Sequence, residues 1–199
     1  MHIEIRSLEG RHVRLEPLVS AHREGLRGAL DCDEEAWEIM TVNGCGDGFE
    51  GWWARALGDK RRRERITYSV RERQTNQIVG ATSFLNLRPL HKGVEIGSTF
   101  LHVDSRSGAV NPESKLLLLG HAFDSGAIRV EFRVDERNGR SEASLQKLGA
   151  MKEGSLRRQM ITWTGHVRDT AVYSIVDYDW PGVKQRLEFR LRQDFDLTP

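Results

Sequence analysis

The sequence predicts an α+β domain built on one mixed, mostly antiparallel β-sheet flanked by helices. Three features point to this fold class: a meander of short apolar strands in the first half, a strand–helix–strand–helix succession in the middle, and further strands before a final helix. Strands joined by tight turns pair antiparallel, whereas strands separated by a helix can pair in parallel. A chain of 199 residues can bury one full core. We therefore expect a single domain over residues 1–199, with its core at about 10–178 and a C-terminal helix at about 180–195.

Composition and charge exclude several classes of protein. The chain is 38% hydrophobic and 30% charged, as in soluble globular proteins, and its net charge of +1 gives no electrostatic case for binding nucleic acid or a membrane surface. No run approaches the roughly 18 apolar residues that a spanning helix needs, and the first residues lack the apolar segment of a signal peptide. Cys32 and Cys45 lack metal-ligand spacing. These features predict a cytoplasmic protein with free thiols and no metal site.

The first half of the chain alternates short strands with amphipathic helices. Val13 and Leu15 alternate with charged neighbours, which is the pattern of a half-buried strand, and Pro17 closes it. Ser20 is placed to cap the helix that follows. The other elements expected here are helical pieces at Glu34–Met40 and Phe49–Leu57, a glycine-rich loop at Thr41–Gly48, and strands at Thr67–Arg71 and Ile78–Leu85.

The middle of the chain has the pattern of an anion-binding strand–loop–helix unit. An apolar strand, Val94–Leu101, is followed by a short loop that begins at Arg106, and a helix opens with Asn111 as N-cap, Pro112 at the first helical position and Glu113 in the first turn. The free N–H groups of a first helical turn and the helix dipole attract anions. The unit therefore predicts a phosphate or pyrophosphate ligand; an ordinary strand-to-helix connection is the alternative.

A second strand–helix unit follows the first. The strand Arg129–Val134 precedes Asn138–Ser141, and the next helix ends at Gly149, which suits the left-handed position after a helix. The elements expected in the last part of the chain are a hairpin turning at Thr164-Gly165, a strand at Ala171–Val176 and a helix at Trp180–Phe195.

These motifs resemble those of the GNAT superfamily of acyl-CoA-dependent N-acetyltransferases, in particular its RimJ/RimL-like branch. One departure concerns the phosphate loop, which in the superfamily usually reads Arg/Gln-x-x-Gly-x-Gly/Ala. Here Ala109 and Asn111 stand at the fourth and sixth positions, where a Cβ can crowd a pyrophosphate or forbid a positive φ. The segments that carry the resemblance are Gly10–Leu18, Val94–Gly97, Asn111–Leu119, His121–Phe123, Asn138–Ser141, Leu148–Ala150, Glu153-Gly154, Arg168–Thr170 and Val172–Ile175.

The resemblance implies a fold, a co-substrate and a set of binding residues. It implies a central strand that splays from its parallel neighbour and leaves backbone groups unpaired for the pantetheine arm of acetyl-CoA. The cofactor-binding residues that it implies are Phe100, Leu101, His102, Val103, Arg106, Ser107, Gly108, Ala109, Val110, Asn111, Asn138 and Ser141.

The chemistry that the resemblance implies is direct attack of an amine on a thioester, without a covalent enzyme intermediate. Glu95, on the central strand, is the candidate base, because partial desolvation raises a carboxylate's pKa towards a useful range; an exposed or salt-bridged side chain is the alternative. Ser141 is the candidate general acid for the leaving thiolate, with helix capping as its alternative. His121 is expected to be a packing residue, and His102 is a weaker candidate than Glu95.

The acceptor is expected to be a primary amine, either a protein or peptide N-terminus or a small molecule. Glu95 and the tryptophans Trp37, Trp52 and Trp53 are the candidate acceptor-binding residues, although aromatic side chains also simply fill cores. Two other classes of function stay open: a non-catalytic acyl-CoA-binding module, and a scaffold that binds a partner protein. The terminal helix can either seal the core or form a homodimer contact.

Overall fold

The computed structural model describes residues 1–62 and 64–195. In this part of the chain, eight strands form one sheet in the order β1-β2-β3-β4-β5-β6-β8-β7. The strands are β1 (Leu8–Glu9), β2 (Val13–Pro17), β3 (Arg65–Glu72), β4 (Ile78–Arg88), β5 (Gly93–Leu101), β6 (Arg129–Asp135), β7 (Met151–Ile161) and β8 (Val167–Val176). The helices are α1 (Arg23–Leu30), α2 (Phe49–Arg62), α3 (Val110–Asp124), α4 (Gly139–Leu148) and α5 (Trp180–Phe195).

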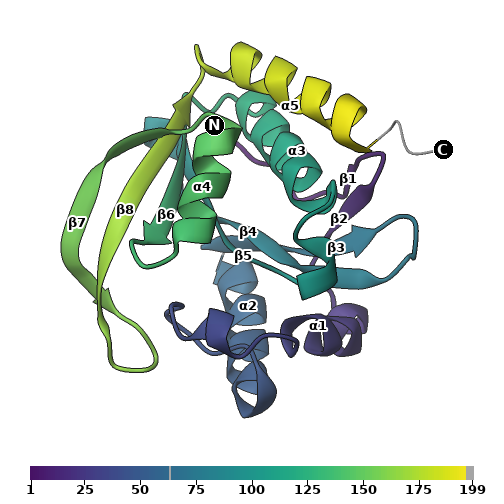
Figure 1. Cartoon of the computed structure of the whole chain (residues 1–199), viewed down its shortest axis with the longest axis vertical. Coiled ribbons are helices and arrows are strands. Elements are labelled where there is room, and N and C mark those ends of the chain that lie inside the picture. Colours follow the sequence, from purple (N-terminus) through teal and green to yellow (C-terminus); the bar gives the residue numbers. More distant parts are fainter. Residues whose placement is uncertain (63, 196–199) are drawn as a thin grey trace.

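Helices cover both faces of the sheet, as Figure 1 shows: α3, α4 and α5 lie on one side, and α1 and α2 on the other. Each strand pair is antiparallel except β5 and β6, which are parallel. The expected α+β fold with a mixed, mostly antiparallel sheet is therefore confirmed.

The central parallel strands separate after a short stretch of pairing. Only Gly93–Glu95 of β5 pairs with β6, opposite Arg129–Glu131, although both strands continue well beyond these residues. On its other side β5 bulges against β4, because Ala81 pairs with Phe100 and Ser83 with Gly97, so that two residues face one. The expected splay of the central strands is thus present, and it opens the sheet near its middle.

Two hydrophobic clusters fill the two sides of the sheet. Val94 and Ile96 of β5 belong to the cluster under α3 and α5, whereas Phe100, beyond the bulge, belongs to the cluster with α1 and α2. Glu95, between Val94 and Ile96, faces the α1 and α2 side because strand side chains alternate. The apolar positions of α5 expected from its sequence are buried in the first cluster or against it, at Val183, Leu187 and Leu191.

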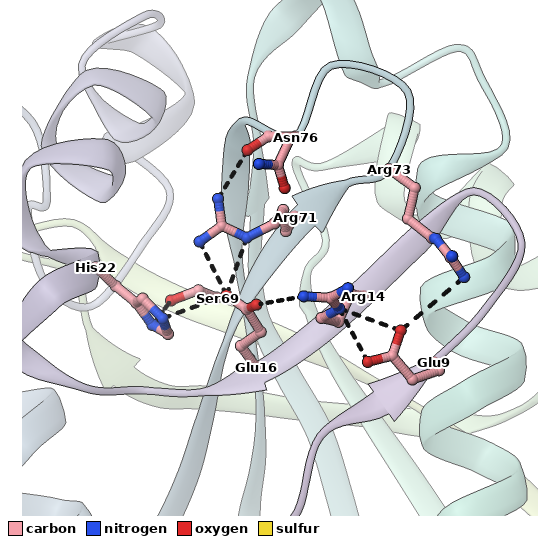
Figure 2. A network of polar contacts seen from close by, with 8 residues as sticks. All are labelled: Glu9, Arg14, Glu16, His22, Ser69, Arg71, Arg73 and Asn76. Atoms are coloured by element: carbon pink, nitrogen blue, oxygen red, sulfur yellow. Dashed lines mark hydrogen bonds and ion pairs between the residues drawn. The ribbon is translucent and has the colours of Figure 1, made fainter.

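A polar network ties β2 to α1 and β3 on the α1 side (Figure 2). The Glu16 carboxylate of β2 lies 3.0 Å from an Arg71 nitrogen and 3.2 Å from His22 Nε2, and the Ser69 hydroxyl lies 2.9 Å from His22 Nδ1. Burial lowers the pKa of His22, and this effect outweighs the attraction of Glu16. This network fixes the orientation of α1 on the sheet.

Three local expectations about helix starts are wrong. α3 begins at Val110 with Ala109 as N-cap, so Asn111 lies inside the first turn and donates instead to Ser144 Oγ of α4, at 3.2 Å. Ser20 begins a 3-10 turn rather than capping α1, whose N-cap residue is His22. The piece expected at Glu34–Met40 is only a 3-10 turn, Glu35–Trp37, because the chain there turns to bury Trp37.

Other expectations about the elements are confirmed. Gly149 has a left-handed φ of 89° after α4. His121 is buried in α3, and its Nε2 lies 2.8 Å from the Glu4 carbonyl oxygen, as befits a packing residue.

Within the described residues, no helix combines the length and the apolar character needed to span a bilayer.

Candidate active site

A cleft opens where β5 and β6 separate, and it is lined from both sides of the sheet. Residues of α3 and α4 line one side, including Asn111, Ser141 and Ser144. The segment 36–40 lines the other side together with Arg133 and Arg168, which lie on β6 and β8. The cleft is therefore bordered by residues from both faces of the sheet.

The charge of this cleft is mainly positive. The charged side chains that line it within the described chain are Arg106, Lys115, Arg133, Asp135, Arg140 and Arg168. Asp135, the single acid among them, is engaged by the Arg137 guanidinium, with the shortest distance 2.8 Å. A cleft with this excess of cations favours an anionic ligand.

The loop that carries Ala109 has an ordinary backbone. Ala109 has φ −68° and ψ −18°, which is right-handed helical, and no residue of 106–111 is among the described residues with a left-handed φ. A Cβ at Gly108 would meet no atom within 4 Å. The missing glycines therefore cost no backbone strain, and the first N–H groups of α3 remain available to an anion.

Arg106 fixes the loop to two neighbouring segments. Its Nε donates to the Leu101 carbonyl oxygen at 2.8 Å, and its guanidinium forms an ion pair with Asp33 and lies 5.2 Å from the centre of the Phe100 ring. The ion pair holds the pKa of Asp33 below its usual value. Arg106 lines the cleft, where Asp33 neutralises part of its charge, and its contact with a cofactor stays a prediction.

Glu95 is a buried carboxylate beside the cleft. The residue is only 6% exposed, Asn86 Nδ2 donates to Oε2 at 2.6 Å, and Arg133 Nε lies 3.5 Å from the same oxygen. Burial raises the pKa of Glu95, against the lowering effects of Asn86 and Arg133. A Cβ at Gly97 would lie 3.1 Å from Glu95 Oε1, so the carboxylate reaches towards a residue that lines the cleft. The Glu95 carboxylate is thus buried, and its one charged partner in the described chain, Arg133, lies 3.5 Å away.

Asn138 and Ser141 both line the cleft at the start of α4. The Asn138 side chain accepts a hydrogen bond from the Ser141 N–H at 3.0 Å, so Asn138 is the N-cap of this helix. The structure therefore gives Asn138 a capping role. Contacts of either residue with a cofactor stay predictions.

The backbone after β5 is less free than the resemblance implies. The His102 N–H donates to the Val79 carbonyl oxygen at 2.8 Å, and the Leu101 carbonyl oxygen accepts from Arg106. These two groups are paired within the chain, so they are not free for a pantetheine arm. Phe100 and Leu101 line the cleft, whereas Val103 is exposed outside it.

The three tryptophans lie in the core. Trp37, Trp52 and Trp53 are 3%, 5% and 7% exposed, and they pack in the cluster with α1 and α2. Trp37 stacks on Phe100 with ring centres 4.5 Å apart, so it supports a residue of the cleft from behind. The described lining of the cleft contains none of the three. Their burial matches the alternative that they fill the core.

Sequence reasoning missed Lys115, Arg133 and Arg168. The signal for Lys115 was available: it lies three and four residues before Leu118 and Leu119, which are fully buried, so it shares their helix face. The two arginines gave no such signal, because charged residues on a strand are usually solvent-exposed.

Comparisons with known proteins agree with this geometry. The family model of the acetyltransferase (GNAT) domain matches residues 12–151. The uncharacterised N-acetyltransferase YoaA of Bacillus subtilis strain 168 is 34% identical over 112 residues, which are 56% of this chain and 62% of that protein, so the match spans less than two thirds of it.

Two solved structures have the same fold. One, assigned as an acetyltransferase of T. thermophilus, has a TM-score of 0.86 and 35% identity, covering 96% of this chain and 100% of that chain. RimJ of Mycobacterium smegmatis, in complex with CoA-disulfide, has a TM-score of 0.76 and 19% identity, covering 90% of each chain; at this identity it shows the fold alone.

The fold, with its splayed pair of parallel central strands, is that of an acetyltransferase domain. The family match extends over more than half of the chain. The protein belongs to the GNAT N-acetyltransferases, in their RimJ/RimL-like branch, a family that uses acetyl-CoA as co-substrate.

Proposed function

We propose that this protein transfers the acetyl group of acetyl-CoA to a primary amine. The observation that carries the proposal is the cleft at the splayed strands, which a cofactor can enter from α3 and α4 and an acceptor from the opposite side. The excess of cations in the cleft supports an anionic cofactor, and the buried Glu95 beside Gly97 supports a base on the acceptor side.

The phosphates of acetyl-CoA belong, in this proposal, at the N-terminus of α3. The N–H groups of residues 107–111 and the helix dipole attract the pyrophosphate. Asn111 and Ser144, hydrogen-bonded across α3 and α4, hold the two helices beside the arm. Asn138 and Ser141 lie further along the same side of the cleft.

The reaction is a direct displacement. The acceptor nitrogen attacks the thioester carbon, the new C–N bond forms, and the C–S bond breaks with its electron pair on sulfur. Glu95 takes the proton that the nitrogen loses, directly or through water. Ser141 passes a proton to the thiolate and regains one from water. Most of the rate comes from positioning the two reactants, because the thioester is already activated.

The acceptor that we propose is a peptide N-terminus. The approach on the acceptor side is lined by Ala36, Ile39 and Met40 next to Arg133 and Asp135, which suits an extended chain with apolar and polar side chains. A small primary amine is the alternative. The proposed reaction needs no second copy of the chain, because one chain supplies each of the groups named.

The test is an acceptor screen that follows release of the CoA thiol. We expect acetyl transfer to at least one peptide or small amine, and a fall in kcat of about 10²–10³-fold in Glu95→Gln, because general base catalysis contributes about this much. The control is Glu142→Gln, which changes a half-buried carboxylate of α4 that is paired with Lys152 and accepts a hydrogen bond from Tyr173. Acceptor turnover that is equal in Glu95→Gln and wild type would remove Glu95 from the mechanism.

A further inference from the structure

A buried lysine in the cleft has no carboxylate partner among the described residues. Lys115 of α3 is 8% exposed, it lines the cleft, and its Nζ donates to Thr99 Oγ1 at 2.8 Å. No ion pair within 4.0 Å is recorded for it in the described part of the chain. An ammonium group carries three donors, so one hydroxyl leaves two of them without a protein partner.

A purely structural role explains this lysine poorly. Its neighbours on the same helix face, Leu118 and Leu119, fill their positions with apolar side chains. A buried charge with only a neutral partner is unfavourable, and burial lowers the pKa of Lys115 to about 8. An apolar side chain of the same length would fill the space at a lower cost, so the charge calls for a ligand.

The position of the ammonium group indicates which part of a ligand it meets. Thr99 follows Ser98 in the bulge of β5, where Ser98 has a left-handed φ of 47°. In the proposed function the phosphates lie at the N-terminus of α3, which begins at Val110, five residues before Lys115. An acyl-CoA with its phosphates there extends its thioester end along β5 towards Thr99, and therefore towards Lys115.

We propose that Lys115 donates a hydrogen bond to the thioester carbonyl oxygen of acetyl-CoA and stabilises the negative charge that develops there during attack. The inference rests on the proposed acetyl transfer. Lys115 keeps its proton throughout: the carbonyl oxygen gains charge as the C–N bond forms and loses it again as the C–S bond breaks. A donor fixed in a water-poor cleft is the usual way to stabilise such an oxyanion.

The test compares acetyl-CoA with S-ethyl-CoA, a thioether that has a CH₂ group where acetyl-CoA has its carbonyl. Calorimetric titration of the wild type is expected to show about tenfold tighter binding of acetyl-CoA, as one hydrogen bond from a charged donor provides. Lys115→Met should bind the two ligands equally. Lys147→Met, which changes an exposed lysine of α4, is the matched control and should keep the tenfold preference.

Two further readouts separate a catalytic contact from a structural one. Lys115→Met should raise the Tm by about 3 °C or more, because it removes a buried charge, while kcat with any acceptor falls about 10²–10³-fold. A lysine that only supports the fold would instead lower the Tm when replaced. Thr99→Val, which removes the hydroxyl that orients Nζ, should reduce the ligand preference and is the second variant if Lys115→Met does not fold.

The outcomes distinguish this inference from the proposed function. Wild-type binding of both ligands, with the same preference in Lys115→Met, would overturn the role of Lys115 and leave acetyl transfer intact. If Lys115→Met does not fold, an unchanged ligand preference in Thr99→Val would likewise overturn the role of Lys115 and leave acetyl transfer intact. A wild type that binds neither ligand would overturn the proposed function itself, and the role of Lys115 with it.

Discussion

Glu95 and Lys115 carry opposite charges, and both are buried near the cleft, on opposite faces of β5. Each has a neutral hydrogen-bond partner, Asn86 for Glu95 and Thr99 for Lys115. Burial favours the neutral form of each group. It raises the pKa of Glu95 and lowers the pKa of Lys115 to about 8. Such paired perturbations in a cleft are typical of catalytic sites.

The raised pKa of Glu95 predicts the pH dependence of the reaction. A base acts when deprotonated, so kcat should rise with pH through a pKa above the ordinary carboxylate value of 4.5. Rate–pH profiles of wild type and Glu95→Gln test this expectation, with the ionisation of the acceptor amine common to both. We expect the variant to keep only the rise with pH that the acceptor amine causes. An acidic limb of the same position in Glu95→Gln would assign it to another group.

At the scale of elements, buried polar side chains fix the helices on the sheet. The Glu113 carboxylate of α3 accepts hydrogen bonds from the backbone N–H groups of Arg11, His12 and Val13, at 2.8, 2.6 and 2.7 Å, and so ties α3 to the start of β2. His22 and Glu16 do the same for α1. Since α3 lines the cleft, its contacts with β2 also hold that wall of the cleft in place.

The His22 network predicts acid sensitivity of the fold. The pKa of His22 is lowered in the folded state from 6.5, so the unfolded chain binds more protons between that lowered pKa and 6.5. Stability from this group is therefore present above pH 6.5 and is lost as the pH falls below it. Melting curves between pH 5 and 8 should show a smaller loss of Tm at low pH in His22→Asn than in wild type. Parallel curves would show that His22 does not contribute.

Patterns of apolar and polar residues predicted most elements, but not details that depend on tertiary contacts. The alternation in β2 and the glycine after α4 are local signals, and both were correct. The cap of α3 was misplaced by two residues because Asn111 and Pro112 suit several positions of a first turn, and the contact with Ser144 that decides between them is not local. β7 was missed over most of its length because both of its faces are exposed and carry charges.

The candidate site is also predictable only where local signals in the sequence determine it. The loop and Glu95 lie on a motif with fixed spacing, so their places in the fold follow from the sequence. The fate of Trp37, Trp52 and Trp53 depends on how α1 and α2 pack, and sequence alone leaves both core and pocket open to them. The pairing of Arg106 with Asp33, which is 73 positions away, has no local signal.

At the scale of the whole molecule, the sheet is continuous from edge to edge except where β5 leaves β6. Pairing between these strands covers three residues at one end, and α3 and α4 follow the two separated strands directly. The opening is therefore built into the order of the elements, and both proposed approaches to it come from one chain. Binding of a ligand in this opening should stabilise the fold by about 2.7 kcal/mol at a ligand concentration of 100 Kd.

Calorimetric titration with acetyl-CoA, on wild type and Arg106→Ala, tests the central claim most directly. We expect micromolar binding in the wild type and about tenfold weaker binding in Arg106→Ala, because the variant loses the ion pair and hydrogen bond that hold the loop at the start of α3. Arg157→Ala, an exposed arginine of β7, is the control and should bind as the wild type does. A folded wild type that gives no heat with acetyl-CoA would contradict the account, because the loop with Ala109 and Asn111 would then not bind the cofactor.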